Sequence, residues 1–345
     1  MDNLKVVVIG GVACGPKAAA RLKRLNPNAQ VTLIEKGEWI SYGGCGLPYY
    51  VGATVKEIDD LMTTSWEAVR TPEFMKATKD IDTLLGYEAI KIDRQKKEVK
   101  VQKVGTNEIK TLAYDKLVLA TGSENVIPPI KGVEGKGVFE MKTPEDGTEL
   151  QDYLKSGIEH AVIVGSGLIG MEVMEACANW GIDVTVIEMM DQIFPKLLDS
   201  DLALVLQDYL ESEDIQFKLN TKVEEILLDD AGVVKGVRTS DGEIDCQLVL
   251  MATGVRSDVK LAKEAGIECN PAVIVNKHMQ TSDPDIYAGG DCVMVQHRIS
   301  GELTFAPMGS TANKHGRIIA IFKNFTVCLG QQSLSCSIGL QVKWV

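Results

Sequence analysis

The chain has 345 residues, 45% of them hydrophobic and 24% charged, and a formal net charge of −12. These values are typical of a globular protein large enough for two domains, and the acidic balance argues against general electrostatic binding to nucleic acid or anionic lipid. No apolar run approaches the length of a membrane span, and the N-terminus lacks the layout of a signal peptide, so we expect a cytoplasmic protein. The eight cysteines form no CxxC pair, so neither a disulfide framework nor a metal site is expected.

The N-terminal segment has the pattern of a βαβ unit. Residues 4–9 (LKVVVI) form an uninterrupted apolar run, typical of a parallel strand buried on both faces, and lead into the glycine turn GGVACG at residues 10–15. A helix is expected over residues 18–25, followed by a strand that ends at Glu35. This arrangement predicts a dinucleotide site. Val12 replaces the second glycine of the usual motif, but its N–H and the helix N-terminus can still meet a pyrophosphate.

The segment ISYGGCGLPYYVG, residues 40–52, places Cys45 between glycines with no second cysteine nearby. Glycines allow other groups to approach closely, and a helix is expected to begin near Cys45, with Pro48 in its first turn. The N-terminus of a helix favours the thiolate, which is the nucleophilic form of cysteine. We therefore predict that Cys45 bonds to an external sulfur or is itself oxidised. Cys14, in the first glycine turn, is expected to pack as a small hydrophobic residue.

A second βαβ pattern occupies residues 160–188. A strand leads into a complete G-x-G-x-x-G motif at residues 165–170, and a helix and another strand follow, ending at Glu188. One such motif would be a weak signal, but two in one chain, each with a terminal acid, predict two dinucleotide sites.

Three later segments connect the two halves of the chain. Matching strands within residues 114–123 and 246–255 each end in Ala-Thr-Gly, and Asp291 follows a short strand within residues 281–292. We predict an α/β fold with two Rossmann-like three-layer dinucleotide-binding domains, the second inserted into the first.

The chain resembles the FAD-dependent pyridine nucleotide–disulfide oxidoreductases. The resemblance rests on six motifs in the family's order and spacing: GGVACG, SYGGCGLPYYVG, YDKLVLATGS, VGSGLIGMEV, MATGVRSD and TSDPDIYAGGDC. Because Cys45 lacks the C-x4-C partner of the two-cysteine members, the chain is most similar to the single-cysteine branch. That branch holds coenzyme A disulfide reductases, coenzyme A–persulfide reductases, and NADH oxidases and peroxidases. The resemblance implies an FAD-binding domain of residues 1–123 and 254–320 and an NAD(P)H-binding domain of residues 124–253.

The resemblance also implies the site residues, with Cys45 as the catalytic one. FAD is expected at Gly10, Gly11, Val12, Ala13, Gly15, Glu35, Lys36, Ser41, Ala120, Thr121, Gly122, Gly290 and Asp291. The nicotinamide nucleotide is expected at Gly165, Gly167, Leu168, Ile169, Gly170, Glu188 and Gly254. A carboxylate at Glu188 accepts hydrogen bonds from a free ribose hydroxyl and repels a 2′-phosphate, which favours NADH over NADPH.

Within the branch, the residues favour reduction of a low-molecular-weight disulfide or persulfide, such as coenzyme A disulfide, by electrons passed from NADH through FAD to Cys45. Oxidases and peroxidases of this family typically carry a histidine in the first glycine turn, and this turn has none. The histidines are expected to be structural or surface residues: His160, His278, His297 and His315. An NADH oxidase or peroxidase with a cysteine sulfenic acid, or an inactive nucleotide-binding form, are the alternatives.

A polyanionic acceptor needs local cations on an acidic protein. Lys17 and Arg21 share a helix face at i, i+4 spacing, and Lys76 resembles a family position near the substrate, so these three are the expected substrate-binding residues. Gly44 stands where coenzyme A-reducing members often have asparagine, which leaves a smaller or inorganic sulfur acceptor open.

The resemblance ends after residue 320. The family's C-terminal domain forms the homodimer interface, whereas residues 321–345 have no clear helix or strand period and are too few for a domain. We interpret this tail as a truncated or frame-shifted end, which leaves dimer formation and activity open.

Overall fold

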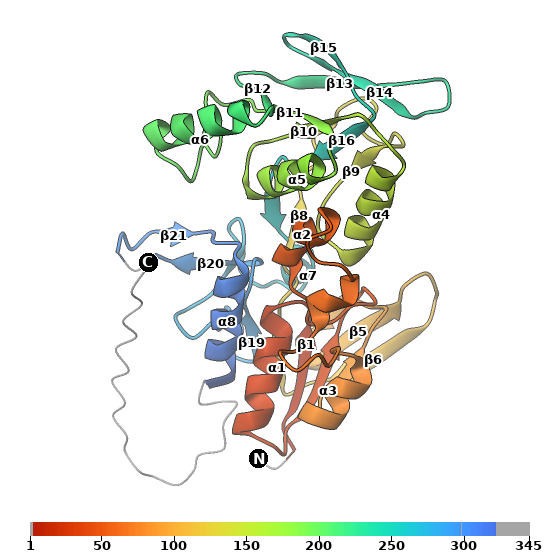
Figure 1. Cartoon of the computed structure of the whole chain (residues 1–345). Coiled ribbons are helices and arrows are strands. Elements are labelled where there is room, and N and C mark those ends of the chain that lie inside the picture. The colour runs from red at the N-terminus through yellow and green to blue at the C-terminus, as the bar shows by residue number, and fades with distance from the viewer. Residues whose placement is uncertain (1–2, 298, 322–345) are drawn as a thin grey trace.

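The computed structural model describes residues 3–297 and 299–321 (Figure 1). Two five-stranded sheets, parallel throughout, form its framework. The first has the order β19–β7–β1–β2–β3 and the second the order β12–β11–β10–β16–β9. In the first sheet the strands are β1 (Lys5–Ile9), β2 (Gln30–Ile34), β3 (Asp82–Leu84), β7 (Lys116–Leu119) and β19 (Ile286–Ala288). In the second they are β9 (Val138–Phe139), β10 (His160–Val164), β11 (Asp183–Ile187), β12 (Gln216–Lys218) and β16 (Leu248–Met251).

Helices cover these sheets, which confirms the predicted α/β fold class with Rossmann-like layers. The described helices are α1 (Cys14–Leu25), α2 (Leu47–Val51), α3 (Pro72–Lys79), α4 (Pro144–Lys155), α5 (Leu168–Asn179), α6 (Ser200–Ser212), α7 (Lys260–Glu264) and α8 (Gly309–Ile321). Short 3₁₀ turns span Gly44–Gly46 and Ile58–Met62. No helix in the described part of the chain is long and apolar enough to cross a lipid bilayer.

Smaller sheets complete the fold, and the sequence patterns did not predict them. One contains β4 (Tyr87–Asp93), β5 (Glu98–Lys103) and β6 (Ile109–Ala113). A second contains β13 (Val223–Leu228), β14 (Val234–Thr239) and β15 (Gly242–Asp245). A third combines β18 (Val273–Ile274), β20 (Val293–Gln296) and β21 (Leu303–Thr304).

The chain leaves the first sheet after β7, builds the whole second sheet, and returns to the first sheet at β19, which pairs with β7. The two crossings lie side by side, because β8 (Ser123–Asn125) and β17 (Val255–Ser257) form an antiparallel pair. This topology supports an inserted second unit, while the domain boundaries stay predictions.

Helix α1 begins at Cys14, four residues before the expected start at Ala18. Pro16 is tolerated there because the first turn of a helix needs no N–H from it. Helix α1 packs closely against α8, where a Cβ on Gly316 would stand 2.5 Å from the carbonyl oxygen of Cys14. Ile321 still belongs to α8, and the rest of the predicted tail lies outside the described residues.

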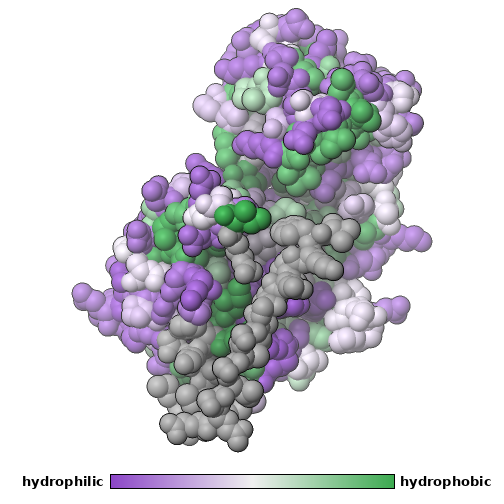
Figure 2. Space-filling view, turned by 90° about the vertical axis from the view of Figure 1, so that its left-hand side faces the viewer, coloured by the Kyte–Doolittle hydropathy of each residue, from purple (hydrophilic) through white to green (hydrophobic). Residues whose placement is uncertain are grey.

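Helix α6 buries little of its apolar surface. Ala203 is buried, whereas Leu202, Val205 and Tyr209 are exposed. Figure 2 shows hydrophobic surface on the upper part of the molecule, on the side where α6 lies in Figure 1.

Candidate active site

The predicted FAD residues meet at one edge of the first sheet. Gly10 follows β1, Glu35 follows β2, residues 120–122 follow β7, and Asp291 lies three residues after β19. The four strands are parallel and lie side by side in the order β19–β7–β1–β2. The segments that follow them therefore lie together at the carboxyl edge of the sheet. Ligands of open α/β sheets bind outside this edge.

Glu35 is held in place by the first glycine turn. Its Oε2 accepts a hydrogen bond from the N–H of Gly11 at 2.6 Å, and its Oε1 accepts one from the N–H of Gly37 at 3.0 Å. The loop before Cys45 is attached to the same turn, because the N–H of Ser41 donates to the carbonyl oxygen of Gly11 at 2.7 Å. Lys36, next to Glu35, is exposed.

The second glycine turn repeats this arrangement and adds a hydroxyl. Oε2 of Glu188 accepts hydrogen bonds from the N–H of Ser166 at 2.9 Å and from its Oγ at 2.8 Å. Oε1 of Glu188 accepts one from the N–H of Met190 at 3.0 Å. Gly165, Glu188 and Gly254 follow β10, β11 and β16, so the predicted nicotinamide-nucleotide residues meet at the carboxyl edge of the second sheet.

Each glycine turn packs closely against the end of a neighbouring strand, where a side chain would not fit. A Cβ on Gly10 would stand 2.0 Å from the carbonyl oxygen of Ala120, and one on Gly165 would stand 2.4 Å from that of Ala252. A Cβ on Gly167, at the start of α5, would meet nothing within 4 Å, so open space lies where a pyrophosphate would meet the helix N-terminus. The residues present therefore fit one dinucleotide at each turn.

Asp291 lies in a packed environment beside this edge. The Oγ of Ser257 donates to its carbonyl oxygen at 2.7 Å, and burial raises the pKa of its carboxyl group. The N–H of the preceding Gly290 donates to Nδ1 of His315 at 3.3 Å. Burial lowers the pKa of His315 to about 4, so this histidine is a neutral structural residue, as expected.

Cys45 lies in the 3₁₀ turn that precedes α2 and is exposed. Its Sγ would stand 3.7 Å from a Cβ on Gly309, so the first residue of α8 lies against the thiol. Gly46 packs against Leu61, whose Cδ2 would stand 2.5 Å from a Cβ there, so a larger residue would require this side chain to shift. Cys14, in contrast, is buried, and burial raises the pKa of its thiol well above the usual range, which fits its expected packing role.

Basic side chains gather beside the loop that carries Cys45. Burial and then repulsion by neighbouring cations lower the pKa of Lys17 and of Lys79, and Arg24 and Arg70 contribute to both shifts. Arg70 donates to the carbonyl oxygen of Ser41 at 3.2 Å, which brings this group to the cysteine loop.

None of Lys17, Arg21, Arg24, Arg70 and Lys79 forms an ion pair with a carboxylate of the described residues. Nε of Arg21 is buried without a hydrogen-bond partner. An anionic group would therefore find uncompensated positive charge here. We call these five residues the basic cluster.

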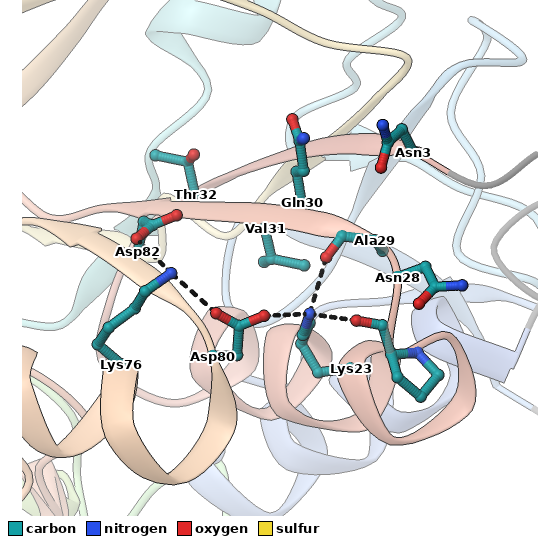
Figure 3. A pocket seen from close by; sticks show the side chains of 11 residues that line it. Asn3, Lys23, Asn28, Ala29, Gln30, Val31, Thr32, Lys76, Asp80 and Asp82 are labelled. Carbon is teal, nitrogen blue, oxygen red and sulfur yellow. Dashed lines mark hydrogen bonds and ion pairs between the residues drawn. The ribbon is translucent and has the colours of Figure 1, made fainter.

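Lys76 is placed differently. Its Nζ bonds to Asp80 at 2.8 Å and to Asp82 at 3.0 Å, at a polar cavity of about 490 Å³ that also holds Lys23 (Figure 3). Its charge is thus already neutralised, so its contacts do not support the predicted substrate role. Lys79, one helical turn further along α3, belongs to the basic cluster and was not among the predicted substrate residues, because only the family position of Lys76 pointed to this helix.

A family model for pyridine nucleotide–disulphide oxidoreductases matches residues 4–312. The chain belongs to this family. Membership implies a flavin and a nicotinamide nucleotide as cofactors. The chain is 37% identical over 317 residues to an NADH oxidase of Methanocaldococcus jannaschii, covering 91% of this chain and 69% of the relative. It is 34% identical over 319 residues to an NAD(P)H coenzyme A polysulfide/persulfide reductase of Pyrococcus horikoshii, covering 91% and 68%.

A solved structure shows the same similarity. The NAD-dependent persulfide reductase of A. fulgidus superposes with a TM-score of 0.89 at 40% identity, covering 92% of this chain. The chain spans 58% of the length of that protein.

Proposed function

We propose that the chain passes electrons from NADH through FAD to Cys45, which reduces a low-molecular-weight disulfide or persulfide such as coenzyme A disulfide. The observation that carries the proposal is an exposed, glycine-flanked thiol whose loop adjoins a basic cluster that forms no ion pair with a carboxylate in the described part of the chain. The names of the P. horikoshii and A. fulgidus relatives agree with a sulfur acceptor.

The two glycine turns divide the cofactors between them. The first turn, with Glu35 and Asp291, would hold FAD, which when bound supplies the two-electron relay between nicotinamide and sulfur. The second turn and Glu188 would hold the nicotinamide nucleotide. NADH is favoured over NADPH because Glu188 presents carboxylate oxygens to the ribose, and the following Met189 and Met190 are exposed and carry no charge for a 2′-phosphate.

Cys45 acts on the acceptor by thiol–disulfide exchange. The Cys45 thiolate attacks one sulfur of the substrate, a Cys45–sulfur bond forms, and the substrate's own sulfur–sulfur bond breaks. The leaving thiolate takes a proton from solvent, which reaches the exposed turn. Two electrons from NADH then cleave the Cys45–sulfur bond, which restores the Cys45 thiolate and releases the sulfur held on it as a second thiol from a disulfide or as hydrogen sulfide from a persulfide. Each cycle thus consumes one NADH for each sulfur–sulfur bond reduced.

The basic cluster suits an acceptor that carries phosphate groups. Coenzyme A has such groups at one end and its sulfur at the other, so cations beside the cysteine loop could hold the first while Cys45 meets the second. Lysine and arginine contacts with phosphates are charge-assisted hydrogen bonds, which are about twice as strong as neutral ones.

The second candidate is an NADH oxidase in which Cys45 passes through a sulfenic acid. The M. jannaschii relative carries that name, and an exposed thiol is open to oxidation. We propose further that the protein acts in the cytoplasm and that residues 1–123 with 254–320, and residues 124–253, form the FAD and nicotinamide domains.

The test is an anaerobic NADH titration of the purified flavin-loaded chain, followed by addition of coenzyme A disulfide or coenzyme A persulfide. We expect flavin reduction by NADH, and then NADH-dependent release of coenzyme A that Cys45→Ser abolishes and Cys269→Ser, at a half-buried cysteine, leaves unchanged. Oxygen-dependent NADH consumption that needs Cys45, without coenzyme A release, would favour the oxidase. Turnover that survives Cys45→Ser would refute both roles for this thiol.

A further inference from the structure

Helix α2 begins two residues after Cys45, yet its apolar side chains belong to the core of the second sheet. Leu47 is 1% exposed and Val51 is fully buried. Both lie in the hydrophobic cluster of α4, α5 and the second sheet, together with residues such as Leu150 and Val173. The loop before Cys45 is bound to the first glycine turn through Ser41. Cys45 therefore lies between segments held by the two different sheets.

The last carbonyl groups of α2 are bound by side chains from the second unit. Nε2 of Gln151 in α4 donates to the carbonyl oxygen of Tyr50 at 2.5 Å, and Nε1 of Trp180 donates to that of Val51 at 2.7 Å. Lys155 donates to Oε1 of Gln151 at 2.6 Å, which orients the amide with its nitrogen toward α2. The final carbonyls of a helix have no partner within the helix. The Trp180 bond therefore supplies one to Val51, whereas the Tyr50 carbonyl accepts from both Gln151 and the N–H of Ala53, the latter at 3.0 Å.

Two glycines let the helices approach closely enough for these bonds. A Cβ on Gly52, which ends α2, would stand 3.1 Å from Cα of Ala176 in α5. A Cβ on Gly147 in α4 would stand 3.3 Å from Cδ2 of Leu47. Because α2 has only five residues, fixing its carbonyl end also fixes the turn that carries Cys45.

Helix α5 connects this contact to the second glycine turn. It begins at Leu168, directly after the turn, and ends at Asn179, directly before Trp180. Its twelve residues span roughly 18 Å. The N-terminus of α5 thus lies at the proposed nicotinamide-nucleotide site, and Trp180, directly after its C-terminus, bonds to α2.

We propose that Gln151 and Trp180 are positioning residues for Cys45. They act through the carbonyl end of α2 and hold the thiol at a fixed place relative to both nucleotide sites. An effect of these residues on turnover rests on the redox role proposed for Cys45. Loss of Trp180 removes the donor to the Val51 carbonyl, and loss of Gln151 leaves the Tyr50 carbonyl with the N–H of Ala53, at 3.0 Å. Either change weakens the hold on the short helix and lets it shift, which moves Cys45 without touching either glycine turn.

The experiment compares Trp180→Phe and Gln151→Met with Trp66→Phe in the full flavin-loaded chain. Trp180→Phe keeps an aromatic ring and removes the donor, and the control changes a tryptophan that is 71% exposed. The rate of Cys45 alkylation by iodoacetamide is followed by peptide mass spectrometry, beside the melting temperature, the rate of flavin reduction by NADH and the kcat for coenzyme A disulfide.

We expect the alkylation rate to change at least threefold and kcat for coenzyme A disulfide to fall five- to tenfold in both donor variants, with flavin reduction within twofold of wild type. Donor variants that match Trp66→Phe in alkylation and kcat would overturn the inference. A parallel fall in flavin reduction, kcat and melting temperature would also overturn it, because it would show a merely structural role. If the wild-type chain reduces no acceptor, the proposed function fails, and the alkylation rates still decide whether these residues position Cys45.

Discussion

Replacing Ser166 by alanine removes one of three hydrogen bonds to the carboxylate of Glu188. The hydroxyl donates to Oε2 at 2.8 Å, whereas the backbone N–H groups of Ser166 and Met190 remain in place. Ser166 is fully buried, so alanine fits without a new clash. The variant should therefore loosen the carboxylate that receives the adenosine ribose of NADH and leave the turn intact.

The expected size follows from the bond that is lost. A hydrogen bond to a charged group contributes about 1.5–3 kcal/mol, and since two donors remain we expect a loss of about 1 kcal/mol. That corresponds to a rise of roughly fivefold in KM for NADH. NADPH should change little because its 2′-phosphate cannot use the Glu188 carboxylate, so the preference for NADH should fall by the same factor.

The assay measures KM and kcat for both coenzymes together with flavin content. Glu35 offers an internal control, because its clamp by Gly11 and Gly37 is a separate structure and FAD retention should not change. Glu188→Gln should have the larger effect. Each carboxylate oxygen accepts from a backbone N–H, so the amide N–H₂ of glutamine would face a donor whichever way it is turned. A KM for NADH within twofold of wild type in Ser166→Ala, or equal changes for both coenzymes, would refute this reasoning.

Lys23→Met should lower the free energy of unfolding by about 2–4 kcal/mol, because the buried ammonium donates to two backbone carbonyls. A loss under about 1 kcal/mol, measured by denaturant titration, would contradict this. Arg21→Ala with Lys79→Ala should raise KM for coenzyme A disulfide about tenfold at low salt and less at high salt, whereas Lys76→Ala should change it under twofold. Equal effects of the two replacements would remove the basic cluster from substrate binding. Burial lowers the pKa of His315 from 6.5 to about 4, so only the unfolded chain binds its proton between these values and stability should fall as pH drops from 7 toward 4. His315→Gln should flatten that decline by up to roughly 3 kcal/mol, and an unchanged pH profile would argue against a buried neutral imidazole.

The sequence predicted the parts of the site that local patterns encode. An apolar run, a glycine turn and a terminal acid occur within about thirty residues of one another, and parallel pairing then brings the ends of the strands to one edge. This is why Gly10, Glu35, Gly165 and Glu188 lie where the motifs predicted.

Features that depend on contacts between distant segments could not be read in this way. Lys76 and Lys79 lie one turn apart on helix α3. The carboxylates of Asp80 and Asp82 pair with Lys76 and neutralise its charge, which the sequence of the helix does not indicate. The bond from Trp180 to Val51 joins residues 129 positions apart, and no periodic signal marks it. Such contacts depend on packing of the two sheets, which a single sequence does not show.

The two proposed chemistries differ in what the Cys45 thiolate attacks, a substrate sulfur or a peroxide oxygen. Peroxide or oxygen chemistry at sulfur benefits from a proton donor beside it. The first glycine turn, GGVACG, holds no proton-donating histidine, and His315 is buried with its Nδ1 already accepting from Gly290. Disulfide or persulfide exchange needs no proton-donating side chain beside the sulfur, because solvent at the exposed turn can protonate the leaving thiolate. The groups around Cys45 thus supply what exchange needs, a reachable thiol and positive charge for an anionic acceptor, and this balance favours the reductase over the oxidase.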